Sequence, residues 1–403
     1  MTTVLRCGTL FDGTGTPPVD DALIVVEAGR ISAIGRATGP LPASATSVLD
    51  LSDKFVMPGL VDAHSHASIV PGDGDQSGQM RQPVVRQALR AVDNIRRDLA
   101  AGTTTMRLMA EEHFLDIDLR EAIEAGTIPG PRLLCATRGM TASNGHGRAI
   151  STFDGVDEMR RGARENFARG ADHLKIFATG GVSSPGSTLT TSGYSRQEIA
   201  AVVEEAERVG SYVAAHAHGG PGLRLAIQEG VATIEHGQLA SDEDVALMIG
   251  RHVHLVCTFS ILFHPTGIEQ GDARNPAIMA KVHAARARAN ANFPRVLKSG
   301  VRFAVGTDSM HGLMPYELQT LVRLGVSATD ALLAATRWGA EACRVANDTG
   351  SLEIGKRADI LALDANPLQD ITAVKHVALV MTAGRVFEPR SLPQLAAAGV
   401  GQV

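Results

Sequence analysis

The sequence predicts an α/β fold: a (β/α)8 TIM barrel over residues 58–352, with one composite β-sandwich domain built from residues 1–57 and 353–403. Two observations predict it. Eight short apolar, β-prone runs occur from residue 59 onward, and most are followed by a helical pattern, which is typical of a parallel sheet. Both flanks instead alternate apolar and polar residues, as antiparallel strands do.

The eight apolar runs are short and regularly placed, and each is expected to form one barrel strand. A barrel of this kind takes about 250 residues, and more with insertions, which matches the central segment. The expected strands cover residues 59–64, 103–109, 131–137, 173–177, 212–216, 232–236, 254–259 and 301–306.

The two flanks carry the remaining strand patterns. Residues 3–56 alternate between turns such as Asp12-Gly13 and Ala28-Gly29, and residues 358–363 and 377–384 alternate near the other end. Neither flank alone has enough strands for an independent core, so we expect both to join in one small β domain. Segments 71–80 and 264–277 are expected to be long loops, which after barrel strands often cover an active site.

Composition and charge exclude several classes of partner. The net charge is -5 and no dense run of Lys and Arg occurs, so neither nucleic acid nor a membrane surface is expected. We expect a small-molecule substrate, a homo-oligomer and, because no export signal is evident, a cytoplasmic location. The cysteines are far apart without paired spacing, which favours a reducing compartment: Cys7, Cys135, Cys257 and Cys343.

The most informative local pattern is His64 and His66, two residues apart at the end of the first barrel strand. Residues i and i+2 of a strand share a face, so both imidazoles are directed to the same side. Imidazole nitrogens are common ligands of Zn²⁺ and related ions. A chance His-x-His is also common among 14 histidines, so the pair alone does not establish a metal site.

Four further candidate ligands lie in or at the end of other expected strands: Lys175, His216, His236 and Asp308. The carboxyl ends of barrel strands meet at one mouth, so side chains distant in sequence can gather there. Each also has a structural alternative. A strand lysine can be salt-bridged, the two histidines can be core residues, and Asp308 can cap a helix.

Together these motifs resemble the amidohydrolase superfamily over nearly the whole chain. The resemblance includes Pro-Gly-Leu-Val-Asp-Ala-His-Ser-His at 58–66, Gly-Thr-Asp-Ser at 306–309 and Gly-Ser-Leu-Glu-Ile-Gly-Lys-Arg-Ala-Asp-Ile at 350–360. Leu-Lys-Ile-Phe-Ala-Thr-Gly-Gly-Val at 174–182 and Ala-His-Ala-His-Gly at 215–219 resemble its metal-dependent carboxypeptidases and Xaa-Pro dipeptidases, the prolidase-like subgroup.

The resemblance implies a binuclear metal centre. By this resemblance, Lys175 is carbamylated by carbon dioxide and bridges two ions. The modification is required because an ammonium group has no acceptor atom for a cation, whereas a carbamate offers two oxygens. His64, His66 and Asp308 would hold one ion, and His216 and His236 the other. Zn²⁺ is the expected metal, although these ligand types also suit cobalt and manganese. A hydroxide bridging the ions would attack the amide carbonyl, and Asp308 would carry its proton to the leaving amine.

Other residues are candidates for the substrate site. His146, in a Gly-His-Gly loop, is expected to donate to the oxyanion as a catalytic residue, and a solvated surface histidine is the alternative. His218 stands where several Xaa-Pro dipeptidases carry Tyr, which puts proline specificity in doubt. Tyr194 and His311 are candidate substrate contacts, and a packed loop tyrosine is the alternative for Tyr194. The glycine pair at 180–181 is a candidate for the pocket lining.

The leading functional hypothesis is a metal-dependent hydrolase that cleaves an amide bond of a small substrate such as a dipeptide or N-acyl amino acid. One alternative is hydrolysis of a xenobiotic amide, carbamate or urea, since the same nucleophile attacks all of these. Another, from a different class, is a non-catalytic barrel that serves as a scaffold. Metal content separates the enzyme from the scaffold.

Overall fold

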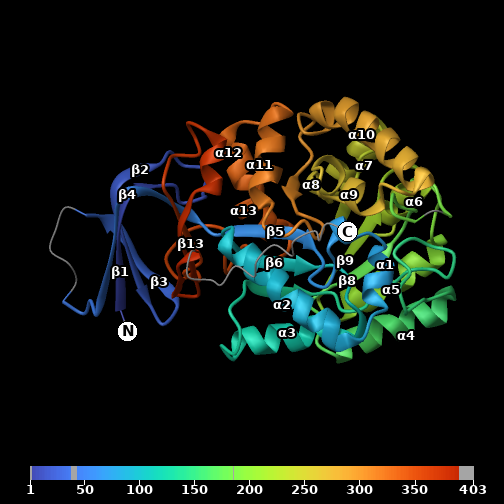
Figure 1. The fold of residues 1–403 in the computed structure, drawn as a ribbon, viewed down its shortest axis with the longest axis horizontal. Coiled ribbons are helices and arrows are strands. Elements are labelled where there is room, and N and C mark those ends of the chain that lie inside the picture. The colour runs from blue at the N-terminus through green and yellow to red at the C-terminus, as the bar shows by residue number, and fades with distance from the viewer. Residues whose placement is uncertain (1, 38–42, 185, 390–403) are drawn as a thin grey trace, which may run out of the picture.

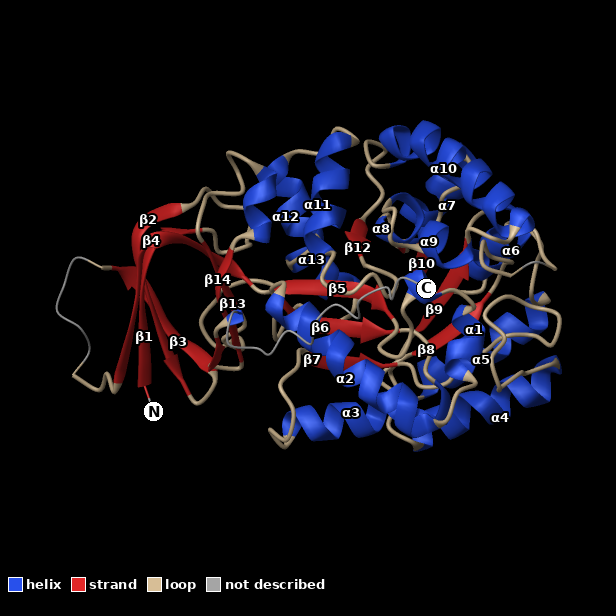
Figure 2. Ribbon diagram, in the orientation of Figure 1, coloured by secondary structure: helices blue, strands red, loops and turns tan. Residues whose placement is uncertain are grey.

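The structure, a computed structural model, describes residues 2–37, 43–184 and 186–389. The molecule is elongated, with a strand-rich part at one end and a barrel surrounded by helices at the other (Figure 1). Figure 2 shows the same division by secondary structure, with the first strands of the chain gathered away from the helices.

The strand-rich part is one seven-stranded sheet built from both ends of the chain. Its strand order is β15-β14-β13-β4-β1-β2-β3. Strand β4 joins the two contributions, because it pairs in parallel with β1 and antiparallel with β13, where Phe55 lies opposite Leu363. The bounds are β1 Thr2–Leu10, β2 Val19–Glu27, β3 Arg30–Arg36, β4 Ser47–Pro58, β13 Ile360–Leu363, β14 Val377–Thr382 and β15 Arg385–Phe387.

One apolar cluster holds this sheet together. It combines buried residues from the N-terminal strands, such as Leu5 and Ile24, with Ile360 and Met381 from the C-terminal strands. The expectation that both flanks join in one β domain is therefore confirmed. The difference from the expected sandwich is that the strands form one continuous hydrogen-bonded sheet, whose two halves share this cluster.

The eight barrel strands occur where the sequence predicts them, in two parallel sheets of strand order β5-β6-β7 and β12-β11-β10-β9-β8. The sheets meet through backbone hydrogen bonds at both edges. Met140 N–H donates to the carbonyl of Lys175 at 2.8 Å, and Asp308 N–H donates to that of His64 at 2.8 Å. The bounds are β5 Leu60–Ser65, β6 Thr103–Leu108, β7 Arg132–Cys135, β8 Leu174–Phe177, β9 Val213–Ala217, β10 Thr233–His236, β11 His254–Cys257 and β12 Phe303–Val305.

Helices surround the barrel strands (Figure 2). They bury apolar faces, as when α5 places Ile199, Val202 and Ala206 in the main core. Ser195 begins α5 with a capping box in which its side chain accepts from Glu198 N–H. The larger helices are α2 Val84–Ala100, α3 Leu115–Glu124, α4 Gly155–Ala168, α5 Arg196–Arg208, α6 Gly220–Gln228, α7 Asp242–Arg251, α10 Pro276–Val296, α11 Met314–Arg323, α12 Ala328–Ala334 and α13 Arg337–Ala342.

The two segments expected as long loops contain short helices. Residues 71–80 form η1 Pro71–Asp73 and α1 Gln76–Met80, and residues 264–277 contain α9 Ile268–Asp272. The two segments contact each other, since Gln270 Nε2 donates to the carbonyl of Gly72 at 3.3 Å. Short helices also occur at η2 Glu112–Phe114, α8 Ser260–Phe263 and η3 Ile371–Lys375.

The four cysteines are all buried and unpaired. Within the described ranges, no helix combines the length and apolar character needed to cross a membrane.

Candidate metal centre

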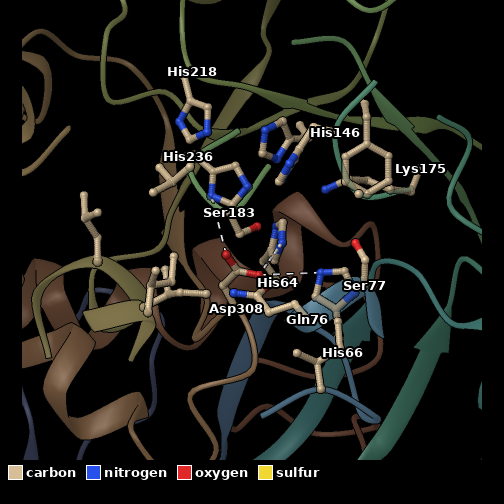
Figure 3. Close-up of a pocket in the computed structure, with 18 of the residues that line it drawn as sticks. His64, His66, Gln76, Ser77, His146, Lys175, Ser183, His218, His236 and Asp308 are labelled. Atoms are coloured by element: carbon tan, nitrogen blue, oxygen red, sulfur yellow. Dashed lines mark ion pairs between the residues drawn. The ribbon is translucent and has the colours of Figure 1, made fainter. Parts of the chain in front are cut away.

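Five of the predicted ligands come from five different barrel strands and meet at one end of the barrel. His64 is the penultimate residue of β5, Lys175 lies in β8, His216 in β9 and His236 ends β10, while Asp308 follows β12. All five line the same pocket, together with His66. Figure 3 labels His64, His66, Lys175, His236 and Asp308 around it. The parallel strand direction explains the convergence, because the carboxyl ends of all strands lie at one face.

Asp308 is the point at which three of the histidines approach one another. Its Oδ1 lies 3.4 Å from His64 Nε2 and 3.5 Å from His66 Nε2, and its Oδ2 lies 4.0 Å from His236 Nδ1. His64, His66 and Asp308 each offer one ligand atom, and these atoms lie within 4.8 Å of one another. This group fits a site for a divalent cation.

The imidazoles of the other two predicted ligands complete the cluster. The ring centroids of His216 and His236 are 4.5 Å apart, and those of His64 and His236 are 4.8 Å apart. A protein oxygen anchors one nitrogen of each ring: His66 Nδ1 is 2.9 Å from Ala110 O, His216 Nε2 is 3.2 Å from Gly180 O, and His236 Nδ1 is 2.8 Å from Thr258 Oγ1. Such anchoring leaves the second nitrogen of a ring for a metal and fixes the ring orientation.

Lys175 has surroundings that do not suit an ordinary ammonium group. Its side chain is fully buried and its Nζ has no hydrogen-bond partner in the described structure. Nζ lies 5.2 Å from the ring centroid of Phe177. Burial lowers the pKa of Lys175 from 10.5 to about 8, so the fraction of neutral amine near pH 7 is larger than for an exposed lysine. An unpartnered amine among potential metal ligands fits the proposed carbamate, which would have cations to bind.

Three of the buried imidazoles are held in the neutral form that metals require. Burial lowers the pKa of His66 to about 4, and it lowers the pKa of His216 and His236 well below the usual range. Burial would raise the pKa of Asp308, but its interactions with His64 and His236 outweigh that effect and lower it. The group therefore combines neutral nitrogen donors with an ionised carboxylate.

The backbone is strained where two of the ligands lie. His236 and Asp308 have positive φ values of 77° and 49°, a conformation that non-glycine residues adopt at a cost. Close packing also holds β12 against β5, because a Cβ at Gly306 would lie 2.4 Å from His64 N. Such constraints fix the ligand positions before any ligand binds.

Sequence reasoning missed two charged residues next to the site. Glu235 Oε2 lies 2.8 Å from His64 Nδ1, and its Oε1 lies 3.0 Å from Arg107 Nη2; all three side chains are almost completely buried. Burial would raise the pKa of Glu235, but Arg107 and His64 lower it to about 2. The sequence does contain a signal for both residues, because each is a charged residue inside an otherwise apolar or neutral strand. Glu235 also lies directly before His236.

The pocket around the cluster has a polar and an apolar part. The described lining residues that bear neutral polar groups are Gln76, Ser77, Ser183 and Gln238, and the apolar ones include Ile69, Met80, Phe177, Val182, Ile261, Leu262 and Ile268. Several of them come from the two segments that were expected to be long loops. Among the described lining residues, Lys175 is the only lysine or arginine.

His146 and His218, two of the predicted substrate-site residues, line this pocket. His146 Nδ1 is 2.7 Å from Ser184 Oγ, and His218 Nδ1 is hydrogen-bonded to Gln238. Nε2 of His218 is buried without a partner in the described structure. Burial lowers the pKa of His146 to about 3 and that of His218 to about 4, so both are neutral near pH 7.

The other two predicted substrate contacts lie outside the described pocket lining. Tyr194 is buried and its hydroxyl donates to the carbonyl of Phe153 at 3.0 Å. His311 is held at both nitrogens, by Asp98 Oδ2 at 2.7 Å and Ile69 O at 3.0 Å. Both polar ends are therefore engaged by the protein, which favours structural roles over the predicted substrate contacts. The glycine pair at 180–181 is likewise not among the lining residues, although Gly181 packs directly against His146.

The fold and the site together define a class: α/β barrel proteins with a histidine and carboxylate cluster at the carboxyl ends of the strands, suited to a metal-dependent hydrolase. The chain belongs to the amidohydrolase family, whose model matches residues 55–387. It is accordingly a hydrolase that acts on amide bonds, as the motifs predicted.

Curated relatives agree with this assignment. Ochratoxinase from Aspergillus niger is 30% identical to the chain over 430 aligned positions, which cover 96% of the chain and 86% of the relative. Imidazolonepropionase from Mycolicibacterium smegmatis is 27% identical and covers 91% of the chain and 92% of the relative.

Solved structures extend the similarity to the predicted prolidase-like subgroup. A Xaa-Pro dipeptidase with bound methionine in its active site is 28% identical with a TM-score of 0.87, covering 96% of this chain and 100% of that one. A prolidase in complex with N-methylphosphonate-L-proline, also 28% identical, has a TM-score of 0.89 over the same shares. The A. niger ochratoxinase structure is 28% identical with a TM-score of 0.85 and covers 97% of this chain and 96% of that one.

Proposed function

We propose that the protein is a binuclear metal-dependent amidohydrolase that cleaves the amide bond of a dipeptide or N-acyl amino acid. The observation that carries the proposal is the convergence of four imidazoles, Asp308 and the unpartnered Lys175 in one pocket. Neither a core packing role nor a simple salt bridge accounts for a buried lysine that has no hydrogen-bond partner in the described structure.

The ligand set divides between two cations. His64, His66 and Asp308 would hold one, His216 and His236 the other, and Lys175 as a carbamate would bridge them. When bound, the two cations, which we expect to be Zn²⁺, would lower the pKa of a bound water towards neutral pH and polarise the scissile carbonyl. The carbamate form of Lys175 is needed because an ammonium has only donors.

The chain's own residues carry the proton and orient the reacting groups. Asp308 lies at the centre of the cluster, where its carboxylate would accept the proton of the attacking water and release it to the leaving amine. His146 faces the same pocket and would donate to the oxyanion from the nitrogen that Ser184 does not engage. Both groups are half-buried at the pocket, and the positive φ of Asp308 constrains its position.

The pocket supports a small substrate with an apolar portion. Ile69, Met80, Leu262 and Ile268 would contact apolar groups, and burying such groups is favourable by about 25 cal/mol per Å². His218, whose Nε2 has no hydrogen-bond partner among the described residues, would contact the polar end of the substrate. The similarity to a Xaa-Pro dipeptidase, a prolidase and an ochratoxinase supports an amide substrate of this size.

A second candidate function is hydrolysis of a neutral xenobiotic amide, carbamate or urea. The observation that favours it is the scarcity of positively charged side chains, since Lys175 is the only lysine or arginine among the described lining residues. A free substrate carboxylate would therefore have to bind to the metal ions or to neutral histidines. The scaffold alternative is disfavoured, because every predicted ligand faces the pocket.

A substrate screen tests the proposal. Purified protein supplied with Zn²⁺ is assayed against dipeptides, N-acyl amino acids, neutral aryl amides, aryl carbamates and phenylureas, with release of the amine as the readout. Hydrolysis of dipeptides or N-acyl amino acids is expected. Cleavage of carbamates and ureas alone would transfer the proposal to the second candidate, and no hydrolysis of any substrate would favour the scaffold.

The cytoplasmic location and the homo-oligomer also stay proposals. The four buried, unpaired cysteines are consistent with a reducing compartment. Light scattering on the purified protein measures the oligomeric state directly, and no nucleic-acid or membrane partner is proposed.

A further inference from the structure

We propose that Glu235, held in place by Arg107, is a positioning residue that fixes the orientation and tautomer of His64 for metal binding. The inference rests on the proposed function, because it concerns the cation that His64 would help to hold. It assigns a role to two buried charges that the proposed chemistry does not otherwise use.

The contact between Glu235 and His64 differs from the anchors of the other ligand histidines. Glu235 offers a carboxylate oxygen 2.8 Å from His64 Nδ1, whereas His66, His216 and His236 are anchored by carbonyl or hydroxyl oxygens. A carboxylate at Nδ1 keeps the proton on that nitrogen and makes the opposite nitrogen a stronger donor. That opposite nitrogen, Nε2, is the one that lies 3.4 Å from Asp308.

Arg107 holds the carboxylate in this position from β6, the strand paired with β5. Its Nη2 lies 3.0 Å from Glu235 Oε1, and its Nη1 donates to Thr233 Oγ1 at 3.2 Å. Its Nε donates to the carbonyl of Ala63 at 2.7 Å, directly before His64 in β5. Arg107 therefore connects β5, β6 and β10 around the imidazole.

The burial of this group indicates that it serves the site. Arg107 and Glu235 are both 0% exposed, and a buried ion pair is seldom worth its desolvation cost as a source of stability alone. Replacing such a pair with apolar residues is often neutral or stabilising. A benefit to His64 gives a reason for a charged pair at this place in the barrel.

The test uses three variants of the full chain. Glu235→Gln removes the carboxylate charge. The double variant Arg107→Met/Glu235→Gln removes both charges, and because it leaves no unpaired buried charge it provides a folded protein if the single variant does not fold. Thr233→Val is the matched control, because it deletes a hydroxyl that contacts Arg107 and Glu235 but leaves the contact with His64 intact. Zn²⁺ affinity is measured by competition with a chromophoric chelator.

We expect the Glu235 variants to bind Zn²⁺ about 10- to 100-fold more weakly, with the control close to wild type. A second readout uses ¹⁵N-histidine spectra of the metal-free protein, assigned with a His64→Asn variant. Wild type should show His64 protonated on Nδ1, and the double variant a mixture of tautomers. Wild-type Zn²⁺ affinity together with an unchanged tautomer in the folded double variant would overturn the inference.

These readouts separate the inference from the proposed function. If wild type binds no divalent cation, the proposed function fails, and the tautomer measured without metal still decides whether Glu235 positions His64. If wild type binds cations and hydrolyses amides but the variants are unaffected, only the inference fails.

Discussion

The backbone N–H of Asp308 donates to the carbonyl of His64 at 2.8 Å, and the carboxylate of Asp308 lies 3.4 Å from the imidazole of the same residue. The first and last strands of the barrel therefore meet at two ligand positions. Asp62 strengthens this junction, since its carboxylate accepts from both Thr307 N–H and His64 N–H at 3.1 Å. The geometry of the site thus depends on how the barrel is brought together.

Replacing Asp308 with Asn is expected to reduce kcat by roughly 10²- to 10⁴-fold, because a general acid and base is lost while the size of the side chain is kept. The measurement is steady-state hydrolysis of the best substrate from the screen, with metal content determined on the same sample. Ser309→Ala, at the next residue, is the control and should retain activity. An Asp308→Asn enzyme as active as wild type would exclude the proton-transfer role.

Replacing Lys175 with Met is expected to stabilise the metal-free protein by about 1–3 kcal/mol, because it removes a buried amine that has no partner in the described structure. The same change should abolish hydrolysis, since no carbamate can form. Denaturant unfolding measures the change in stability, with Zn²⁺ expected to stabilise wild type but not the variant, and an assay with the best substrate from the screen measures the loss of hydrolysis. A less stable metal-free variant would show that Lys175 has a structural role.

Replacing Gly181 with Ala is expected to displace His146, because the added Cβ would lie 2.3 Å from its Nε2. If His146 stabilises the oxyanion, kcat/KM should fall by roughly 10²-fold while bound metal stays constant. Gly186→Ala lies in the same loop and adds its Cβ in open space, so it serves as the control. Equal activity of the two variants would remove His146 from the reaction.

Replacing Glu205 with Gln is expected to destabilise the protein at pH 7 by about 1 kcal/mol. The effect is small because its partner Arg164 is solvent-exposed and its partner Arg160 is only half-buried. Hydrogen bonds from Arg164 lead the effects that lower the pKa of Glu205 from 4.5 to about 2. The depressed pKa of an acid stabilises the fold above pH 4.5, and this contribution is lost as pH falls towards 2.

The corresponding measurement is the difference in unfolding free energy between wild type and Glu205→Gln at several pH values. The difference should be constant from pH 7 to about 5 and should shrink as pH falls below 4.5. A difference that grows on acidification would contradict the assigned ion pairs. Glu204→Gln, which removes only a contact with Arg160, is the matched control and should show a smaller effect.

Much of the fold was predictable because its signals are local. Each barrel strand is a short apolar run, and the structure places β5 to β12 in the expected segments, with β5 and β9 extending one residue beyond them. The ligand positions were predictable for the same reason, since a histidine or aspartate at a strand end must lie at the barrel mouth. Predicting that His64 and His66 lie on the same side required only the two-residue period of a strand.

Contacts between strands were not predictable from one sequence. Glu235 and Arg107 acquire their roles only when β10 and β6, which belong to different sheets, bring these side chains together beside His64, and nothing local in either strand shows that contact. Tyr194 and His311 illustrate the opposite case. Their positions near motifs suggested substrate contacts, but the direction of a loop side chain depends on partners such as Phe153 and Asp98.

We propose that this pocket is a two-cation centre on which hydrolysis depends. Elemental analysis of protein purified after growth in metal-replete medium tests it directly, combined with activity before and after chelation. About two divalent ions per chain are predicted, with activity lost on chelation and restored by added Zn²⁺. Full amide hydrolysis by protein that contains no bound metal would contradict the account.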